Sequence, residues 1–207
     1  MNPFNPLDKQ NLAQRVVNAL LSRPQIRLSE ITRFEGAGVY AIYYTGQFDA
    51  YKPIAGQDIP IYVGKALPAG ARIGGFKLSS HAGTVLFDRL REHAVSIEQT
   101  ENLDINDFWC RYLVVDDIWI SLTEALLIDQ FAPVWNTTVT GFGNHDPGKG
   151  RYNQQRSLWD TIHPGRDWAK KLQPSAKSDQ QIIAAVTKAL QQRMSNLQGA
   201  QVTQSER

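Results

Sequence analysis

The chain of 207 residues has 42% hydrophobic and 20% charged residues, which is typical of one globular domain and excludes a disordered or collagen-like chain. It has no apolar run of about 18 residues that could cross a bilayer, no readable secretory signal, and one cysteine, Cys110, which excludes an internal disulfide; we therefore expect a cytoplasmic protein. The net charge of +2 conceals two basic blocks, residues 65–93 and 141–171, on either side of an acidic block at residues 94–131, so a polyanion could lie on the basic blocks if folding brings them together.

The first predicted elements are a helix and a β-hairpin. The spacing of apolar residues predicts a helix over residues 8–22. Two runs rich in β-branched and aromatic residues, 38–45 and 59–64, predict a hairpin with a long loop. Strand alternation places Tyr40 on one face of the first strand, and Tyr62 on the face of the second strand opposite its immediate neighbours.

The rest of the chain predicts helices around one further strand. The helical spacing of Leu86, Leu90 and Ile97 predicts an amphipathic helix. The predicted segments are a loop at 66–82, a helix at 84–97, a strand at 108–115, a helix at 120–131, a loop at 141–150 and an amphipathic helix at 180–194. The expected fold is α/β: a small, mainly antiparallel sheet flanked by helices, with helical extensions at both ends.

Arg89 and His93 are the first candidates for chemistry. They are four residues apart on the predicted helix, so they are neighbours on its surface and could converge on one ligand. An arginine offers a planar fork of donors to a phosphate and stays cationic at any working pH. The same spacing also fits a surface arginine beside a half-buried histidine, so the pair alone does not identify a site.

Glu124 is the best candidate for a metal ligand, because a carboxylate within the apolar run LTEALLI needs a reason to be there. Residues 121–124 also fit a capping box, in which the glutamate would satisfy the first amide groups of the helix. Local sequence leaves both interpretations open.

Five short motifs follow one another along the chain: Gly38-Val39-Tyr40, Tyr62-Val63-Gly64, Arg89 with His93, Glu124, and Asn136. In this order the sequence resembles the GIY-YIG nuclease superfamily, with valine replacing isoleucine in both namesake triplets. The neighbouring segments RLREH, WNTTVTGFGNH and HPGRDWA look like its type II restriction endonucleases, in particular those that cut the palindrome CCGCGG. The resemblance to the catalytic core covers residues 36–140, and that to the restriction enzymes extends to about residue 172.

The resemblance implies hydrolysis of a phosphodiester with one Mg²⁺ per active site, held by Glu124. Magnesium suits a site with a single protein carboxylate, waters and phosphate oxygens. The resemblance further implies that Tyr40 and Tyr62 face the scissile phosphate, with Tyr40 as general base and Tyr62 as an orienting group. Arg89 would stabilise the transition state, and Asn136 would position the metal-bearing helix or a backbone group.

The general base needs a partner, because a tyrosine with a pKa near ~10 is mostly neutral at pH 7. Its proton must move to another group as water attacks the phosphorus. His93 and Lys65 are both candidates as acceptors or electrostatic activators, and the sequence does not decide between them.

Recognition of DNA is expected from the segments attached to the core. Arginine, asparagine and glutamine suit base edges in the major groove, although the same side chains also contact phosphates. The candidate DNA-binding residues are Arg72 and Lys77 in the first basic block, and Asn144, His145, Arg151, Gln154, Arg156 and Arg166 in the second. A palindromic site implies a homodimer, with a tetramer as the alternative assembly.

The predicted function is therefore that of a bacterial type II restriction endonuclease, which hydrolyses double-stranded DNA at a palindromic G/C-rich site. Two alternatives remain open: a catalytically inactive DNA-binding module, and a repair or homing nuclease of the same superfamily. The expected organisation is one compact domain with an N-terminal helical extension at 1–35, the catalytic core at 36–140 and a DNA-contacting extension and tail at 141–207.

Overall fold

A computed structural model of the chain describes residues 9–68 and 83–205, with side chains described from residue 11 to residue 195 within these ranges. Its centre is an antiparallel sheet with the strand order β1-β4-β2-β3. The strands are β1 (Ile26–Arg27), β2 (Gly38–Tyr44), β3 (Tyr62–Ala66) and β4 (Phe108–Val114). The predicted α/β fold with a small antiparallel sheet is confirmed, including the pairing of β2 with β3. Most of the loop predicted at 66–82 lies outside the described residues.

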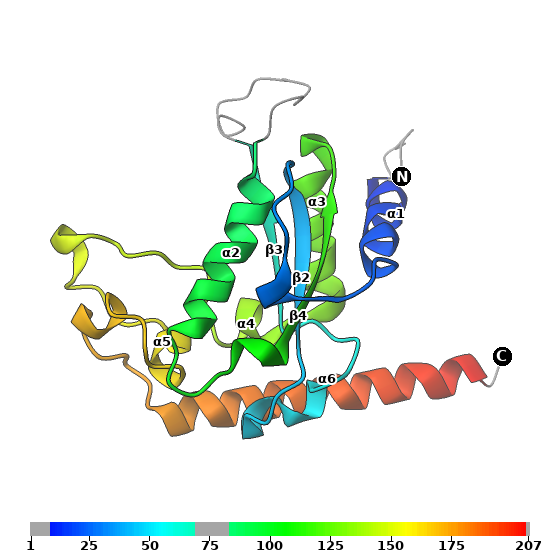
Figure 1. Cartoon of the computed structure of the whole chain (residues 1–207). Helices are drawn as coiled ribbons and strands as arrows, with labels where there is room; N and C mark the ends of the chain where they lie inside the picture. The colour runs from blue at the N-terminus through cyan, green and yellow to red at the C-terminus, as the bar shows by residue number, and fades with distance from the viewer. Residues whose placement is uncertain (1–8, 69–82, 206–207) are drawn as a thin grey trace, which may run out of the picture.

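Helices cover both faces of this sheet, which explains why all seven residues of β2 are buried. On one face, Tyr40 and its alternate neighbours pack against Leu86 and Leu90 of α2 (Val85–Glu98). On the other face, Val39 and its alternate neighbours pack against α1 (Lys9–Leu21) and α3 (Asp117–Phe131). Figure 1 shows α2 on the opposite side of the sheet from α1 and α3. Tyr40 therefore belongs to the layer between the sheet and α2.

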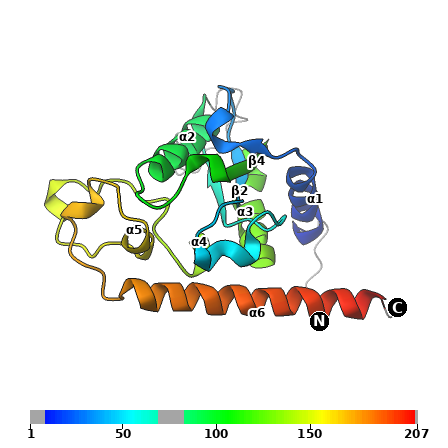
Figure 2. The same cartoon turned by 60° about the horizontal axis from the view of Figure 1, so that its bottom comes forward.

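The remaining elements connect and close this core. They are the short helices α4 (Val134–Thr137) and α5 (Leu158–Ile162), the long helix α6 (Asp179–Ser205), and the 3-10 turns η1 (Leu28–Glu30), η2 (Asp49–Ile54), η4 (Ile105–Asp107), η5 (Lys149–Arg151) and η6 (Ala169–Lys171). Helix α6 runs beneath η2, α4 and α5 (Figure 2) and is longer than the predicted 180–194. It buries Ile182, Val186 and Leu190 against the core. Within the described residues, no helix is both long and apolar enough to span a membrane.

A buried histidine fastens the C-terminal segment to the core. His163, at the end of α5, has its Nε2 atom 2.7 Å from the Tyr51 hydroxyl and its Nδ1 atom 3.0 Å from the Asn102 side-chain oxygen. Trp135 donates a further bond to the same Tyr51 oxygen. Burial lowers the pKa of His163 to about 3, so the ring is neutral at pH 7. The segment after residue 140 therefore packs as part of the domain.

Candidate active site

Two tyrosines meet on the α2 side of the sheet. In the β2–β3 register Tyr40 lies opposite Gly64 and Ile42 lies opposite Tyr62, so both phenols are on one face. Their ring centroids are 6.2 Å apart. The Tyr40 ring crosses over Gly64, where an added Cβ atom would lie 2.3 Å from its hydroxyl oxygen. The two tyrosines that the family resemblance assigns to one site therefore lie close together on one face of the sheet.

Helix α2 brings His93 against both phenols. The His93 Nε2 atom is 2.6 Å from the Tyr40 hydroxyl oxygen, and both side chains are buried. The imidazole also stacks on Phe142 at 4.5 Å and meets the Tyr62 ring edge to face at 5.2 Å. These contacts hold the imidazole in a fixed orientation with one nitrogen on the Tyr40 hydroxyl.

The electrostatics of the site keep these groups neutral in the free protein. Burial raises the pKa of Tyr40 well above its usual value and also raises the pKa of Tyr62, while the positive charge of Arg89 opposes both increases. Burial, followed by the charge of Arg89, lowers the pKa of His93 well below its usual value. In the His93 tautomer that carries its proton on Nδ1, the Nε2 atom accepts the Tyr40 O–H bond across these 2.6 Å.

Arg89 lies beside this pair and is held by three partners. Its guanidinium donates to the Glu92 carboxylate at 2.9 Å, to the Gly143 carbonyl at 3.0 Å, and to Nε2 of His145 at 2.7 Å. The last bond requires an unprotonated His145 Nε2. His145 was predicted as a DNA contact, and the structure places it on Arg89 at the edge of a groove between α2 and the loop at 141–146.

Glu124 reaches the edge strand β3 from α3, which lies on the other face of the sheet from α2 (Figure 1). Its carboxylate is 2.8 Å from the Lys65 ammonium, which also donates to the Ser121 hydroxyl at 3.2 Å. The negative charge of Glu124 contributes to the raised pKa of both Tyr40 and Tyr62, although burial is the larger cause. The carboxylate, the two phenols and the guanidinium therefore share one electrostatic environment.

The capping-box interpretation of residues 121–124 is wrong. Helix α3 begins at Asp117, three residues before the predicted start, so Glu124 lies in its second turn and beyond the unpaired amide groups of the first turn. Two acidic residues open the helix, Asp116 at the N-cap position and Asp117 in the first turn. Negative charge at a helix N-terminus is favourable.

The side chain of Asn136 forms hydrogen bonds with the outer edge of β3. Its side-chain oxygen accepts a bond from the Val63 amide and its side-chain nitrogen donates to the Val63 carbonyl, both at 2.8 Å. The amide thereby replaces the strand that β3 lacks on that side. Because Val63 lies between Tyr62 and Gly64, Asn136 positions a backbone segment of the site, which was one of its two expected roles.

The predicted DNA contacts divide into three groups. Arg72 and Lys77 lie outside the described residues. Asn144, Arg151 and Gln154 are exposed, and Arg156 is half-buried and donates to the Ala169 carbonyl. The prediction for Arg166 is wrong, because its side chain is 1% exposed and is paired with the buried carboxylate of Asp160. A guanidinium enclosed in this way does not reach a DNA surface.

The family model for the Eco29kI GIY-YIG domain, a type II restriction endonuclease family, matches residues 32–190. The chain belongs to this Eco29kI GIY-YIG family. It is a nuclease of the GIY-YIG superfamily, as the order of the five motifs predicted. A search of curated proteins finds no match. The match to the Eco29kI domain includes the segment after residue 140 that carries Phe142, Gly143 and His145.

The contacts of Phe142 and Gly143 with the site are not predicted by the sequence. Phe142 packs on His93 and Tyr62, and the Gly143 carbonyl accepts a hydrogen bond from Arg89. One signal was present in the sequence, since an aromatic residue between two glycines, in GFGNH, is unusual for an exposed polar loop. Recognising it as part of the site required the spatial contact with α2.

Gly143→Ala should lower nuclease activity while leaving stability nearly unchanged. An added Cβ atom would lie 2.9 Å from Arg89 Nη2 and 3.0 Å from the Tyr62 hydroxyl. The end of the flexible arginine yields, so Arg89 leaves its position, and misplacement of about 1 Å can cost on the order of 10²-fold in rate. Plasmid cleavage rates and melting temperatures measure the two effects. Gly150→Ala is the matched control, because its Cβ meets nothing within 4 Å; equal rates for both variants would contradict the argument.

Proposed function

We propose that this member of the Eco29kI family is a type II restriction endonuclease that hydrolyses double-stranded DNA at a specific site with Mg²⁺. The observation that carries the proposal is the hydrogen bond between Tyr40 and His93 beside Arg89, with the charge of Glu124 acting on the same phenol. Eco29kI cuts CCGCGG, and a palindromic site composed of G and C is proposed here for this chain.

The proposed proton path begins at Tyr40. With the His93 proton on Nδ1, the Tyr40 hydroxyl donates to Nε2 at 2.6 Å, and the phenol oxygen keeps lone pairs for the attacking water. As water attacks phosphorus, its proton passes to the Tyr40 oxygen and the phenol proton passes to His93, which leaves the tyrosine neutral. Bound phosphate brings negative charge that opposes the effect of Arg89 on the pKa of His93. This geometry favours His93 over Lys65 as the acceptor, since the Lys65 ammonium is bonded to Glu124 and Ser121.

Arg89 and Tyr62 act on the phosphate in this proposal. The guanidinium offers fixed donors to the oxygens that gain charge in the pentacovalent transition state. The Tyr62 hydroxyl lies near the same guanidinium, at the place where an added Gly143 Cβ atom would touch both groups. Tyr62 therefore orients a phosphate oxygen or the attacking water.

The residues present fit one magnesium ion at Glu124. Its carboxylate is 21% exposed, and the described part of the chain holds no cluster of three or more His, Cys, Asp and Glu residues that would favour a metal rich in protein ligands. A single carboxylate completed by waters and phosphate oxygens is typical of Mg²⁺. When bound, the ion would supply positive charge to the leaving 3′ oxygen. The products would be 5′-phosphate and 3′-hydroxyl ends.

A palindromic site also leads us to propose a homodimer that acts in the bacterial cytoplasm. Each subunit would supply one active site to one strand, because the twofold symmetry of the protein matches that of the site. Exposed Asn144, Arg151 and Gln154 follow the loop that contacts Arg89, and they are the proposed base-contacting or phosphate-contacting residues.

Cleavage of two matched plasmids tests this function. One plasmid carries a single CCGCGG sequence, and in the other the two central base pairs are exchanged to give CCCGGG. The purified protein should linearise the first plasmid in Mg²⁺ and leave the second supercoiled, and it should cut neither plasmid in EDTA. Equal cutting of both plasmids would reject the proposed site. Binding without cutting would indicate an inactive module, and cutting confined to damaged or branched DNA would indicate a repair nuclease.

A further inference from the structure

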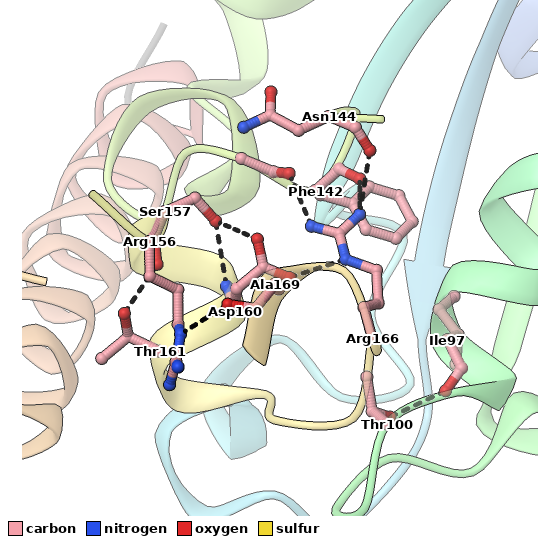
Figure 3. Close-up of polar contacts among 11 residues, drawn as sticks. Ile97, Thr100, Phe142, Asn144, Arg156, Ser157, Asp160, Thr161, Arg166 and Ala169 are labelled. Atoms are coloured by element: carbon pink, nitrogen blue, oxygen red, sulfur yellow. Dashed lines mark hydrogen bonds and ion pairs between the residues drawn. The ribbon is translucent and has the colours of Figure 1, made fainter. Parts of the chain in front are cut away.

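Arg166 forms the centre of a buried network outside the catalytic cluster. Its Nε atom donates to the Asp160 carboxylate at 2.6 Å, and the other carboxylate oxygen of Asp160 accepts the Ser157 hydroxyl at 2.6 Å. The guanidinium carbon of Arg166 lies over the rings of Trp159 and Trp168, 4.6 Å from each ring centroid. Figure 3 shows the guanidinium between Asp160 and the backbone of the 141–146 loop.

The remaining donors of Arg166 bind the backbone of that loop. They reach the carbonyl oxygens of Gly141 at 3.0 Å, Phe142 at 3.0 Å and Asn144 at 3.1 Å. The carbonyl missing from this series belongs to Gly143, and it accepts from Arg89 at 3.0 Å. The loop is therefore held between two arginines, one buried and one in the active site.

The start of the loop is fixed by the same network. Gly141 has φ +117°, and an added Cβ atom would lie 2.2 Å from the Ser157 hydroxyl. Only glycine allows the backbone to approach Ser157 this closely with that φ. The network thus fixes the path of the loop and the positions of the carbonyl groups that accept hydrogen bonds from Arg166.

Stability alone gives a weak reason for this arrangement. A buried ion pair often contributes little net stability compared with apolar residues of similar volume, whereas it does define one conformation. A lysine would supply the same charge without the planar fork that here binds one carboxylate and three carbonyls. By binding the loop, the planar guanidinium of Arg166 holds Gly143 and His145 where they contact Arg89.

We propose that Arg166 is a positioning residue, which acts through the 141–146 loop to hold the Arg89 guanidinium in place for the transition state. The inference rests on the proposed nuclease function. It replaces the role in DNA contact that sequence predicted for Arg166. It also gives the C-terminal segment a part in catalysis in addition to any part in recognition.

Arg166→Lys distinguishes positioning from DNA contact. With enzyme in excess over the CCGCGG plasmid, the single-turnover rate should fall at least about tenfold, while the salt dependence of the Kd for a CCGCGG duplex in Ca²⁺ stays at the wild-type value. A phosphate contact would instead weaken binding and lower the salt slope by about one, with a normal rate at saturating enzyme. That result would overturn the proposal.

A double-mutant cycle with Arg89→Lys tests whether Arg166 acts through Arg89. The double variant should be no slower than Arg89→Lys alone, because the residue that Arg166 positions is already altered. Independent, multiplying losses would overturn the proposal. Ile182→Val, in the core of α6, is the control for a general loss of stability and should keep the wild-type rate at 25 °C.

Two further measurements keep the test decisive. If Arg166→Lys does not fold, Ser157→Ala should give a smaller rate loss of the same kind, since it removes one support of Asp160. Hydrogen exchange across residues 141–146, measured without DNA, should be faster in the variant that folds, and unchanged exchange would overturn the proposal. Failure of the proposed function would appear separately, as a wild-type protein that cuts no plasmid.

Discussion

Glu124→Gln is expected to abolish cleavage and preserve DNA binding. The amide keeps the volume of the carboxylate and still accepts a bond from Lys65, so the fold around α3 is retained. It is a poor ligand for Mg²⁺, which prefers charged oxygen donors. Metal-ion catalysis contributes several kcal/mol to such reactions, so the rate should fall on the order of 10³-fold.

The measurement pairs plasmid cleavage in Mg²⁺ with duplex binding in Ca²⁺. Asp129→Asn is the matched control, because this exposed carboxylate is on the same helix. It should cleave at the wild-type rate. Wild-type cleavage by Glu124→Gln would remove the metal role from this residue, and loss of binding along with cleavage would point to damage to the site as a whole.

Arg89→Ala should be the second most damaging change. The substitution removes the guanidinium that we propose binds the phosphate, and with it the donors to Gly143 and His145. Loss of one preorganised donor to a developing charge costs roughly 10²- to 10³-fold in rate. The lost hydrogen bonds should lower the free energy of unfolding by only about 1 kcal/mol each.

Arg89→Lys separates charge from geometry in that experiment. Lysine keeps the positive charge but lacks two parallel donors, so its single-turnover rate should lie between those of the alanine variant and the wild type. Urea unfolding measures stability on the same samples. If Arg89→Ala lowers the melting temperature and leaves the cleavage rate of the folded fraction unchanged, the arginine is structural and the proposed transition-state role is wrong.

The family resemblance predicted which residues of the candidate site come together, and periodicity predicted only part of their placement. A spacing of four on α2 places Arg89 beside His93, whereas the shared face of Tyr40 and Tyr62 follows from the register of β2 with β3. The choice between His93 and Lys65 was not predictable. It depends on which side chain reaches the Tyr40 hydroxyl, and that follows from packing between α2 and the sheet.

The roles of Glu124 and Arg166 show what local sequence leaves out. The capping box failed because α3 begins at Asp117, and Ser121 and Glu124 instead share a partner, Lys65, from β3. The basic block around Arg166 predicts a contact with DNA, because the sequence shows the charge of a side chain but not whether it is buried. Its enclosure depends on tryptophan rings and loop carbonyls that come together only in the folded chain.

The crossing of the Tyr40 ring over Gly64 gives the second namesake triplet a steric meaning. Gly64 has no positive φ, so the turn geometry that often requires glycine does not apply to it. What the position needs is an empty space beside the strand, because a methyl group there would occupy the volume of the phenol oxygen. Gly64, the last residue of the second triplet, thus leaves the space that is filled by the side chain of Tyr40, the last residue of the first triplet. The two triplets therefore depend on each other sterically.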